Sequence, residues 1–366
     1  MKTHKVGVLG GGQLGRMLAL AGYPLGVECC FYDPNPSACA GQVAPLMSHP
    51  YEDTDALARF AESCEVVTYE FENVPVETVL WLAERVPVHP TPQALQAFQD
   101  RLIEKQTLQE HGIPVPSFAP IDPQDPSAAL EAVGLPAVVK ARRFGYDGKG
   151  QAVVSTQEAF LQAVARCADY PLIAEAFVPF ERELSIIAVR GLDGTTRFYP
   201  LIENLHCEGI LSRSLAPAPQ LSSQIQAQAE SHARALMETL GYVGVMTIEW
   251  FQVGDRLLSN EVAPRVHNSG HWTIEGATTS QFENHLRAIL GLPLGDPSPR
   301  GYSVMFNLIG EVPNPAKVLK HPLAKLHLYG KPPKPRRKLG HITYCFDTPS
   351  AREQFLLTEA LHEGLC

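Results

Sequence analysis

Through the first hundred residues, short apolar runs alternate with segments whose apolar positions recur at helical spacing. The apolar runs are Val6–Leu9, Glu28–Tyr32 and Val66–Tyr69, and the helical segments are Gln13–Ala21 and Thr54–Glu62. Such alternation is typical of a parallel sheet with crossover helices. We therefore predict a Rossmann-like α/β domain over residues 1–100.

The pattern changes twice after that domain. Residues 101–295 mix strands with longer amphipathic segments, and residues 296–366 are rich in proline and short strand-like pieces. In the middle region helices are expected at Arg101–Glu110, Gln157–Cys167 and Gln224–Leu240, and in the last region strands are expected at Tyr302–Ile309 and His341–Phe346. The fold class is then α/β together with α+β, with a small C-terminal β domain packed on the rest.

Two glutamates are expected to face each other on a hairpin in the middle region. The apolar segment Val245–Phe251 and the run that starts at Asn260 flank a turn-like stretch, which favours antiparallel pairing. If the loop is Gly254–Arg256, Glu249 lies opposite Glu261. Facing carboxylates repel unless a cation lies between them, and such oxygen ligands suit Mg²⁺ completed by phosphate and water. The alternative is a pair of solvent-exposed strand glutamates.

A glycine-rich basic loop follows a short apolar strand that ends in Lys140. The loop extends to Gln151 and has glycines at 145, 148 and 150. These glycines allow backbone N–H groups to approach phosphate oxygens, and Lys140 and Lys149 add positive charge. The spacing and the ending of a Walker A loop are absent. An ordinary glycine-rich hairpin with solubilising lysines remains the alternative.

The next apolar strand, Pro171–Val178, runs into a connector. Its terminal backbone groups could bind an adenine edge, and Glu183 just beyond it could accept hydrogen bonds from ribose hydroxyls. The lysine strand, glycine loop, connector strand and carboxylate hairpin together predict a nucleotide clamp.

The N-terminal glycines support a rival hypothesis from another class. Gly10–Gly15 matches G-x-G-x-x-G after a strand, and Asp33 ends the following strand, as in an NAD-dependent dehydrogenase. The clamp favours another use of this domain, in which the helix N-terminus at Gly12–Gln13 holds part of a second substrate. Asp33 then belongs to a turn. A nucleotide sensor without activity is disfavoured, because it has no need of a cluster such as Arg265, His267 and Asn268.

Two further segments carry candidate chemistry. Ligands bind at the carboxyl ends of strands in open α/β sheets, so Glu72 is a candidate acceptor for an amine-bearing substrate, whereas Glu70 could be structural. Residues 331–338 hold five cations. For Lys334 and Arg336 we prefer a solvated surface role.

Taken in order, these segments resemble the ATP-grasp superfamily and, within it, the N5-carboxyaminoimidazole ribonucleotide synthetases. The phrases that carry the resemblance are Gly11–Met17, Gly145–Gln151, Asn204–His206, Gly241–Val245 and Ala263–Trp272. The resemblance implies an ATP-grasp fold and ATP- and bicarbonate-dependent carboxylation of 5-aminoimidazole ribonucleotide through carboxyphosphate, in de novo purine biosynthesis. A formate-dependent glycinamide ribonucleotide formyltransferase is the alternative within the superfamily.

The resemblance also implies a set of site residues and ligands. ATP would contact Arg101, Lys140, Gly145, Tyr146, Asp147, Gly148, Lys149, Gly150, Gln151, Glu175, Ala176, Phe177, Val178, Glu183, His206, Asn260 and Glu261. The ribonucleotide would contact Gly12, Gln13, Leu14, Glu72, Asp147, Lys149, Lys331, Arg337 and Lys338, the last three at its 5′-phosphate. Arg265, His267 and Asn268 would be catalytic, and Glu249 and Glu261 would bind Mg²⁺.

Composition agrees with a cytoplasmic enzyme. The chain has 366 residues, 45% of them hydrophobic, and a formal charge of −9, which argues against nucleic acid as the main partner. The N-terminus lacks the apolar stretch of a signal peptide, and no apolar run is long enough for a membrane span. The eight cysteines show no Cys-x-x-Cys spacing, so we expect reduced thiols. By resemblance we expect a homodimer whose product passes to a separate mutase.

Overall fold

The computed structural model describes residues 3–143, 145, 150–167 and 169–359. Its N-terminal part is the predicted parallel sheet, with strand order β3-β2-β1-β4. The elements are β1 (His4–Leu9), α1 (Gln13–Gly22), η1 (Tyr23–Leu25), β2 (Val27–Tyr32), η2 (Cys39–Gln42), β3 (Leu46–Met47), α2 (Thr54–Glu62), β4 (Val66–Tyr69), α3 (Val76–Ala83) and α4 (Pro92–Gln99). The predicted strands and helices of this region are confirmed, with ends that agree to within two residues.

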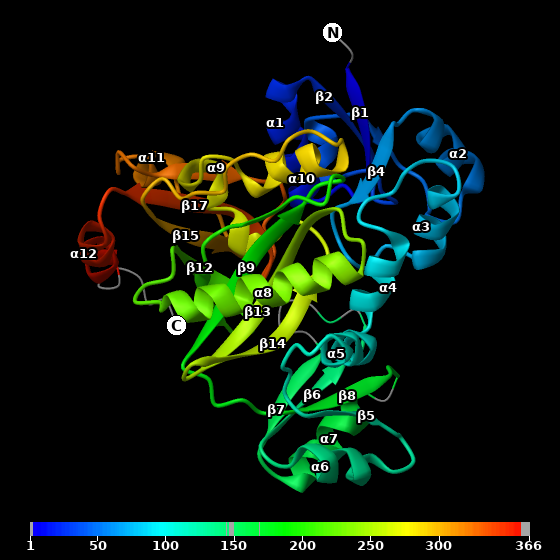
Figure 1. The fold of residues 1–366 in the computed structure, drawn as a ribbon, viewed down its shortest axis with the longest axis vertical. Helices are drawn as coiled ribbons and strands as arrows, with labels where there is room; N and C mark the ends of the chain where they lie inside the picture. The colour runs from blue at the N-terminus through cyan, green and yellow to red at the C-terminus, as the bar shows by residue number, and fades with distance from the viewer. Residues whose placement is uncertain (1–2, 144, 146–149, 168, 360–366) are drawn as a thin grey trace.

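The middle of the chain first forms a small lobe, at the bottom of Figure 1. Helix α5 (Arg101–Glu110) leads into it from the N-terminal domain. The lobe has an antiparallel sheet of order β5-β8-β6-β7 covered by two helices. Its elements are β5 (Phe118–Ile121), α6 (Pro126–Val133), β6 (Ala137–Ala141), β7 (Gln151–Val154), α7 (Gln157–Arg166) and β8 (Leu172–Ala176). The lobe has its own apolar core, which includes Val139, Phe160 and Leu172.

A second and larger sheet follows, with order β14-β13-β9-β11-β12-β15-β17-β16 and β10 paired to β9. Its strands are β9 (Arg182–Arg190), β10 (Thr196–Phe198), β11 (Ile202–Cys207), β12 (Ile210–Ala216), β13 (Gly244–Val253), β14 (Arg256–Ala263), β15 (Tyr302–Ile309), β16 (Lys325–Leu328) and β17 (Lys338–Phe346). Helix α8 (Ser223–Thr239) lies across the face made by β9, β13 and β14 (Figure 1). The remaining elements are η3 (Asn268–Gly270), α9 (Thr273–Gly276), α10 (Gln281–Ile289), α11 (Pro315–Val318) and α12 (Pro349–Glu359).

The C-terminal strands belong to this same sheet. Strand β15 pairs with β12, and β17 pairs with β15, so the last region extends the central sheet instead of forming a sheet of its own. The expected strands at Tyr302–Ile309 and within Lys338–Phe346 are both present. The basic residues 331–338 thereby lie beside the middle region.

The hairpin of β13 and β14 differs from the prediction in its loop. Val253 pairs with Arg256, so the loop is the two residues Gly254–Asp255 and not three. A register shift next to Glu249 then places one extra residue on β14, and Glu249 pairs with Glu261 as expected. The pairing was right, but a β-bulge and not the loop length produces it.

The N-terminal domain packs directly on the central sheet. One apolar cluster contains Val8, Leu14 and Phe31 from the first domain and Val189 and Leu286 from the middle region. This shared core holds the first domain against β9 and α10 of the middle region.

Two expectations on the whole chain can be compared with the structure. Among the helices that the structure describes, none is long and apolar enough to cross a membrane. Within the part of the chain that the structure describes, six cysteines are free thiols and Cys207 is disulfide-bonded, so the expectation of reduced thiols is wrong at Cys207.

Candidate active site

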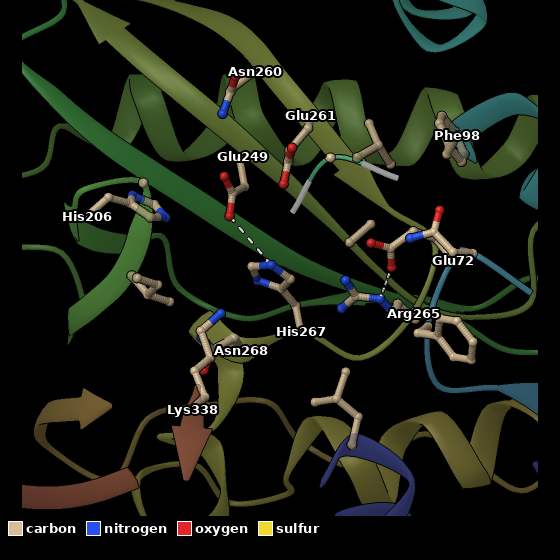
Figure 2. Close-up of a pocket in the computed structure, with 18 of the residues that line it drawn as sticks. Glu72, Phe98, His206, Glu249, Asn260, Glu261, Arg265, His267, Asn268 and Lys338 are labelled. Atoms are coloured by element: carbon tan, nitrogen blue, oxygen red, sulfur yellow. Dashed lines mark hydrogen bonds and ion pairs between the residues drawn. The ribbon is translucent and has the colours of Figure 1, made fainter. Parts of the chain in front are cut away.

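A cavity of about 930 Å³ lies where the N-terminal domain, the small lobe, the hairpin and the basic segment 331–338 meet. Figure 2 shows the hairpin glutamates above it, His267 and Arg265 at its centre and Lys338 below. The residues that line this cavity therefore come from sequence positions as far apart as 13 and 338.

Glu249 and Glu261 face this cavity side by side. Glu249 is buried, and burial together with the Glu261 carboxylate raises its pKa to about 7. Burial opposes ionisation of Glu261 too, but the Arg101 guanidinium, 3.0 Å from its Oε2 atom, lowers its pKa to about 2. One carboxylate is thus compensated by Arg101, and the other lacks a full counter-charge.

This donor set fits Mg²⁺. No group of three His, Cys, Asp or Glu side chains that could hold a metal exists among the described residues. A cation at Glu249 and Glu261 would take two carboxylates from the protein and complete its shell with oxygens from a nucleotide and water, as Mg²⁺ does.

Lys140 lies just behind the cavity wall. Its Nζ atom donates to Glu175 Oε2 at 2.8 Å and to Asn260 Oδ1 at 3.3 Å. Asn260 lines the cavity, so this amide links the lysine of the small lobe to the site. Burial opposes ionisation of Glu175, but Lys105 and Lys140 lower its pKa to about 2. Glu175 is therefore a buried counter-ion.

Two residues of α5 that the sequence reasoning missed belong to this network. Lys105 is fully buried and donates to the backbone carbonyls of Ser259 and Asn260 at 3.0 and 2.6 Å. Glu104 lines the cavity and accepts from the Val262 N–H at 3.2 Å. Burial raises the pKa of Glu104 to about 8. Both lie one helical turn from Arg101, and this spacing was the available signal.

The expected adenine segment is only partly free. The N–H groups of Ala176 and Phe177 donate to Ser117 and Pro136 carbonyls at 2.8 and 3.0 Å. The prediction that the terminal backbone groups of this strand bind adenine is therefore wrong for these two N–H groups, because carbonyls within the lobe accept from them. The carbonyl of Val178 accepts from Phe180 at 2.9 Å.

Glu183 and His206 form a hydrogen-bonded pair on the cavity wall. Glu183 Oε2 lies 2.8 Å from His206 Nδ1. Burial lowers the pKa of His206, but the hydrogen bond to Glu183 and the nearby Glu249 charge raise it overall to about 9. His206 is thus a cation beside the carboxylates, suited to an anionic ligand.

The run from Arg265 to Asn268 enters the cavity from the end of β14. Arg265 Nε donates to Glu72 Oε2, as the dashed line in Figure 2 marks. Burial raises the pKa of Glu72, but the Arg265 guanidinium lowers it overall. Glu72 was predicted to accept from a substrate amine; in the structure one of its oxygens pairs with Arg265. Asn268 is buried, and its amide has no hydrogen-bond partner among the described residues, so it can bind a ligand.

All five cations of the basic segment 331–338 border the cavity, but they differ in exposure. Lys331 lines the cavity and donates to Gln13 Oε1 of α1. Arg337 and Lys338 are half-buried in the same wall. Lys334 and Arg336 are exposed, and Arg336 pairs with Glu208 at 2.7 Å, although both cations border the opening of the cavity.

The N–H groups of the N-terminal glycines donate to carboxylates of the protein itself. The N–H groups of Gly12 and Gly15 donate to the Glu70 carboxylate at 2.7 and 3.0 Å, and Gly11 N–H donates to Asp33 at 2.7 Å. A Cβ atom on Gly12 would lie 2.4 Å from Glu70 Oε1. A dinucleotide pyrophosphate needs these N–H groups, so the dehydrogenase hypothesis is wrong. The same bond occupies the N–H of Gly12 that was expected to bind a substrate, whereas Gln13 and Leu14 line the cavity.

Both ends of the glycine-rich loop belong to the described part of the chain. Tyr146, Asp147, Gly148 and Lys149 lie outside the described residues. The Gly145 carbonyl accepts from Arg101 Nη2 at 3.3 Å, and Gly150 has a φ of +71°, a conformation that glycine adopts readily. Gly145 and Gln151 both line the cavity.

Comparison with known proteins explains this arrangement. Over 362 residues the chain is 49% identical to the N5-carboxyaminoimidazole ribonucleotide synthase of Pseudomonas aeruginosa, covering 98% of this chain and 100% of the relative. The chain belongs to the N5-carboxyaminoimidazole ribonucleotide synthase family. Three domain families match it: the ribonucleotide synthetase preATP-grasp domain at 1–99, the ATP-grasp domain at 106–282 and the phosphoribosylaminoimidazole carboxylase C-terminal domain at 303–354.

Solved structures of synthase family members confirm the ATP-grasp fold. The Thermus thermophilus enzyme superimposes with a TM-score of 0.94 at 56% identity, covering 99% of both chains. The Aspergillus clavatus enzyme, solved in complex with ADP and 5-aminoimidazole ribonucleotide, has a TM-score of 0.89 at 32% identity and 97% coverage of both chains.

Proposed function

We propose that this protein carboxylates 5-aminoimidazole ribonucleotide with ATP and bicarbonate, giving N5-carboxyaminoimidazole ribonucleotide, ADP and phosphate in de novo purine biosynthesis. The observation that carries the proposal is one cavity that holds a carboxylate pair, an Arg-His-Asn cluster and a basic segment. The carboxylate pair suits a nucleotide-bound cation, the Arg-His-Asn cluster suits an anionic carboxyl donor, and the basic segment suits a 5′-phosphate. The names of the relatives support the same reaction.

The ATP side of the cavity is assigned by charge. A Mg²⁺ ion held by Glu249 and Glu261 would supply positive charge to the β- and γ-phosphates. Arg101, Lys140, His206 and residues 145–151 would position the phosphates and Glu183 the ribose, with Asn260 linking Lys140 to the metal side. The adenine would lie along residues 175–178, bound by groups other than the Ala176 and Phe177 N–H groups and the Glu175 carboxylate, which have partners within the protein. Because Glu175 is engaged with lysines, its contribution is to hold Lys140 in place.

In the first step a bicarbonate oxygen attacks the γ-phosphorus and the bond to the β–γ bridging oxygen breaks, which releases ADP and leaves carboxyphosphate. Arg265 is the natural ligand for these anions, since a guanidinium binds oxyanions with paired hydrogen bonds. His267 and the unpartnered Asn268 amide add directed hydrogen bonds.

In the second step carboxyphosphate splits into CO₂ and phosphate, and the exocyclic amine attacks CO₂ and loses a proton to form the carbamate. Gln13, Leu14 and Glu72 line the substrate side, and Lys331, Arg337 and Lys338 would bind the 5′-phosphate. Gly12 would support this wall through Glu70, and Asp147 and Lys149 would orient the substrate. His267 is a candidate for moving the proton.

The organisation of the protein is proposed on the same grounds. We propose domains at residues 1–100, 101–295 and 296–366, supported by the three family matches. A cytoplasmic homodimer that passes its product to a separate mutase follows from the family resemblance.

One paired assay tests the reaction. The protein is incubated with MgATP and either 5-aminoimidazole ribonucleotide plus ¹³C-bicarbonate or glycinamide ribonucleotide plus formate, and ADP and the ¹³C carbamate are measured. We expect ADP and carbamate only with the first pair. ADP release with formate and no carbamate would instead support the formyltransferase alternative.

A further inference from the structure

A buried chain of hydrogen bonds runs across the central sheet and ends at the ring of His267. Ser214 on β12 contacts Asn204 on β11 at 2.7 Å, Asn204 contacts Ser185 on β9 at 2.9 Å, and Ser185 contacts Ser269 in η3 at 2.9 Å. Ser269 Oγ then lies 2.9 Å from His267 Nδ1. All five side chains are at most 8% exposed, so water does not compete for these bonds.

The direction of every bond in this chain follows from one fixed donor. The backbone N–H of Ser269 points at His267 Nδ1, 3.2 Å away, and a backbone N–H can only donate. Nδ1 is therefore an acceptor and carries no hydrogen. The Ser269 hydroxyl must then donate to Nδ1 as well, since two lone pairs would otherwise face each other.

The same logic passes outward along the chain. Because the Ser269 hydrogen is used on Nδ1, the Ser269 oxygen accepts from Ser185, and the Ser185 oxygen in turn accepts from the Asn204 amide nitrogen. The amide oxygen of Asn204 accepts from Ser214. Asn204 can link Ser185 and Ser214 in this way because its amide group has a donor nitrogen and an acceptor oxygen.

The consequence lies on the far side of the ring. A neutral imidazole carries one N–H, so an unprotonated Nδ1 places the hydrogen on Nε2. Nε2 lies 3.5 Å from Glu249 Oε1 and faces the cavity, as Figure 2 shows. The backbone of His267 is also held, because Gln281 accepts from its N–H at 2.9 Å and donates to its carbonyl at 2.6 Å.

We propose that Asn204, Ser185 and Ser269 are positioning residues that fix His267 as the Nε2–H tautomer, so that His267 donates a hydrogen bond to an oxyanion in the cavity. The assignment of the tautomer depends only on the hydrogen-bond chain. The identity of the anion as bicarbonate or carboxyphosphate rests on the proposed function. A ring with the opposite tautomer would present a lone pair to that anion and repel it.

Asn204→Asp is the decisive variant because a carboxylate can only accept. Ser185 would donate to it and Ser269 would donate to Ser185, so the Ser269 oxygen would become an acceptor for an Nδ1–H group, and only the backbone N–H of Ser269 would still favour an unprotonated Nδ1. The ¹⁵N spectrum of the imidazole, with the His267 signals assigned by their loss in His267→Gln, distinguishes the two tautomers. We expect Nε2–H in the wild type, a shift toward Nδ1–H in Asn204→Asp, and a fall in kcat of about 10²-fold with little change in the KM for ATP.

Neutral variants keep the test decisive if Asn204→Asp folds poorly. Ser269→Ala keeps the backbone donor and should have a smaller effect on kcat than Asn204→Asp, whereas Ser185→Ala leaves the Ser269 hydroxyl without its donor. Asn307→Asp is the matched control: Asn307 is a buried amide on β15 of the same sheet that donates to the Leu211 carbonyl at 2.8 Å, outside the chain. It should lose stability but keep the wild-type tautomer and kcat.

The outcomes separate the claims. Nδ1–H in the wild type, or an unchanged tautomer in both Asn204→Asp and Ser185→Ala, would overturn the relay. A shifted tautomer with unchanged turnover would overturn the donor role. Absence of carboxylation by the wild type would refute the proposed function, while the spectrum would still decide the relay.

Discussion

Glu249→Gln should stabilise the metal-free protein while removing most of its activity. In the folded protein the pKa of Glu249 rises from 4.5 to about 7, because the side chain is buried and faces the Glu261 carboxylate. One pKa unit corresponds to about 1.4 kcal/mol, so ionised Glu249 destabilises the fold by about 3 kcal/mol well above pH 7. A neutral glutamine of similar shape removes that charge.

The sign of the pH dependence follows from the raised pKa. Between about pH 4.5 and pH 7 the folded protein holds a proton that the unfolded chain has lost, so this glutamate makes the wild type less stable as pH rises through that range. The advantage of Glu249→Gln should therefore be largest at about pH 8 and should disappear near pH 4.5. Urea unfolding with a chelator present measures it at both pH values.

Addition of MgATP should reverse the order of stability. A ligand at about 1,000 times its Kd stabilises the folded state by about 4.1 kcal/mol, which exceeds the deficit of about 3 kcal/mol, and the variant with one metal carboxylate should gain much less than the wild type. Turnover should fall by orders of magnitude. Glu238→Gln, at an exposed position of α8, is the control that should change neither stability nor activity. Equal stability of Glu249→Gln and the wild type at both pH values, or wild-type turnover with the same Mg²⁺ dependence, would refute the reasoning.

Three further predictions concern other parts of the molecule. Arg265→Ala should bind MgATP almost normally by calorimetry but lose carboxylation; a large loss of ATP affinity with normal turnover at saturating ATP would contradict this placement. Arg337→Ala and Lys338→Ala should each raise the KM for the ribonucleotide roughly 10- to 150-fold, as expected for charge-assisted hydrogen bonds, whereas the exposed Lys334→Ala should not; silence of all three would move the phosphate site elsewhere. Burial lowers the pKa of His285 from 6.5 to about 3, so the unfolded chain binds more protons between these values and stability should fall by up to about 5 kcal/mol as pH drops through them. His285→Gln should flatten that slope in urea unfolding, and an unchanged slope would show that other groups cause it.

Local patterns in the sequence were enough for the elements themselves. Alternation of apolar runs and helical spacing located the first domain, the ends of α5 and β15, and the hairpin that carries Glu249 and Glu261. These features depend on residues that are neighbours in the chain and on the characteristic periods of helices and strands. Both can be read directly from the sequence. The motifs also indicated which segments carry the chemistry.

Other features required the tertiary structure, because they depend on contacts between distant segments. The bulge that aligns Glu249 with Glu261 involves a residue whose backbone is held by Lys105 from α5. Glu70 occupies the N–H group of Gly12, which the motif alone offered to a ligand. No spacing rule predicts such partners, since a charge is buried only where the fold supplies its counter-charge or donor.

The sequence by itself thus determined the elements, the family resemblance and most of the residue types at the site. The tertiary structure decided which of those residues face the cavity and which serve as their buried partners. Ser185, Asn204 and Ser269 illustrate the difference: each lies on a separate element, and only packing of β9, β11 and η3 brings their hydroxyl and amide groups within hydrogen-bond distance of one another. Hydrogen bonds act over about 3 Å, a distance that the order of residues along the chain does not specify.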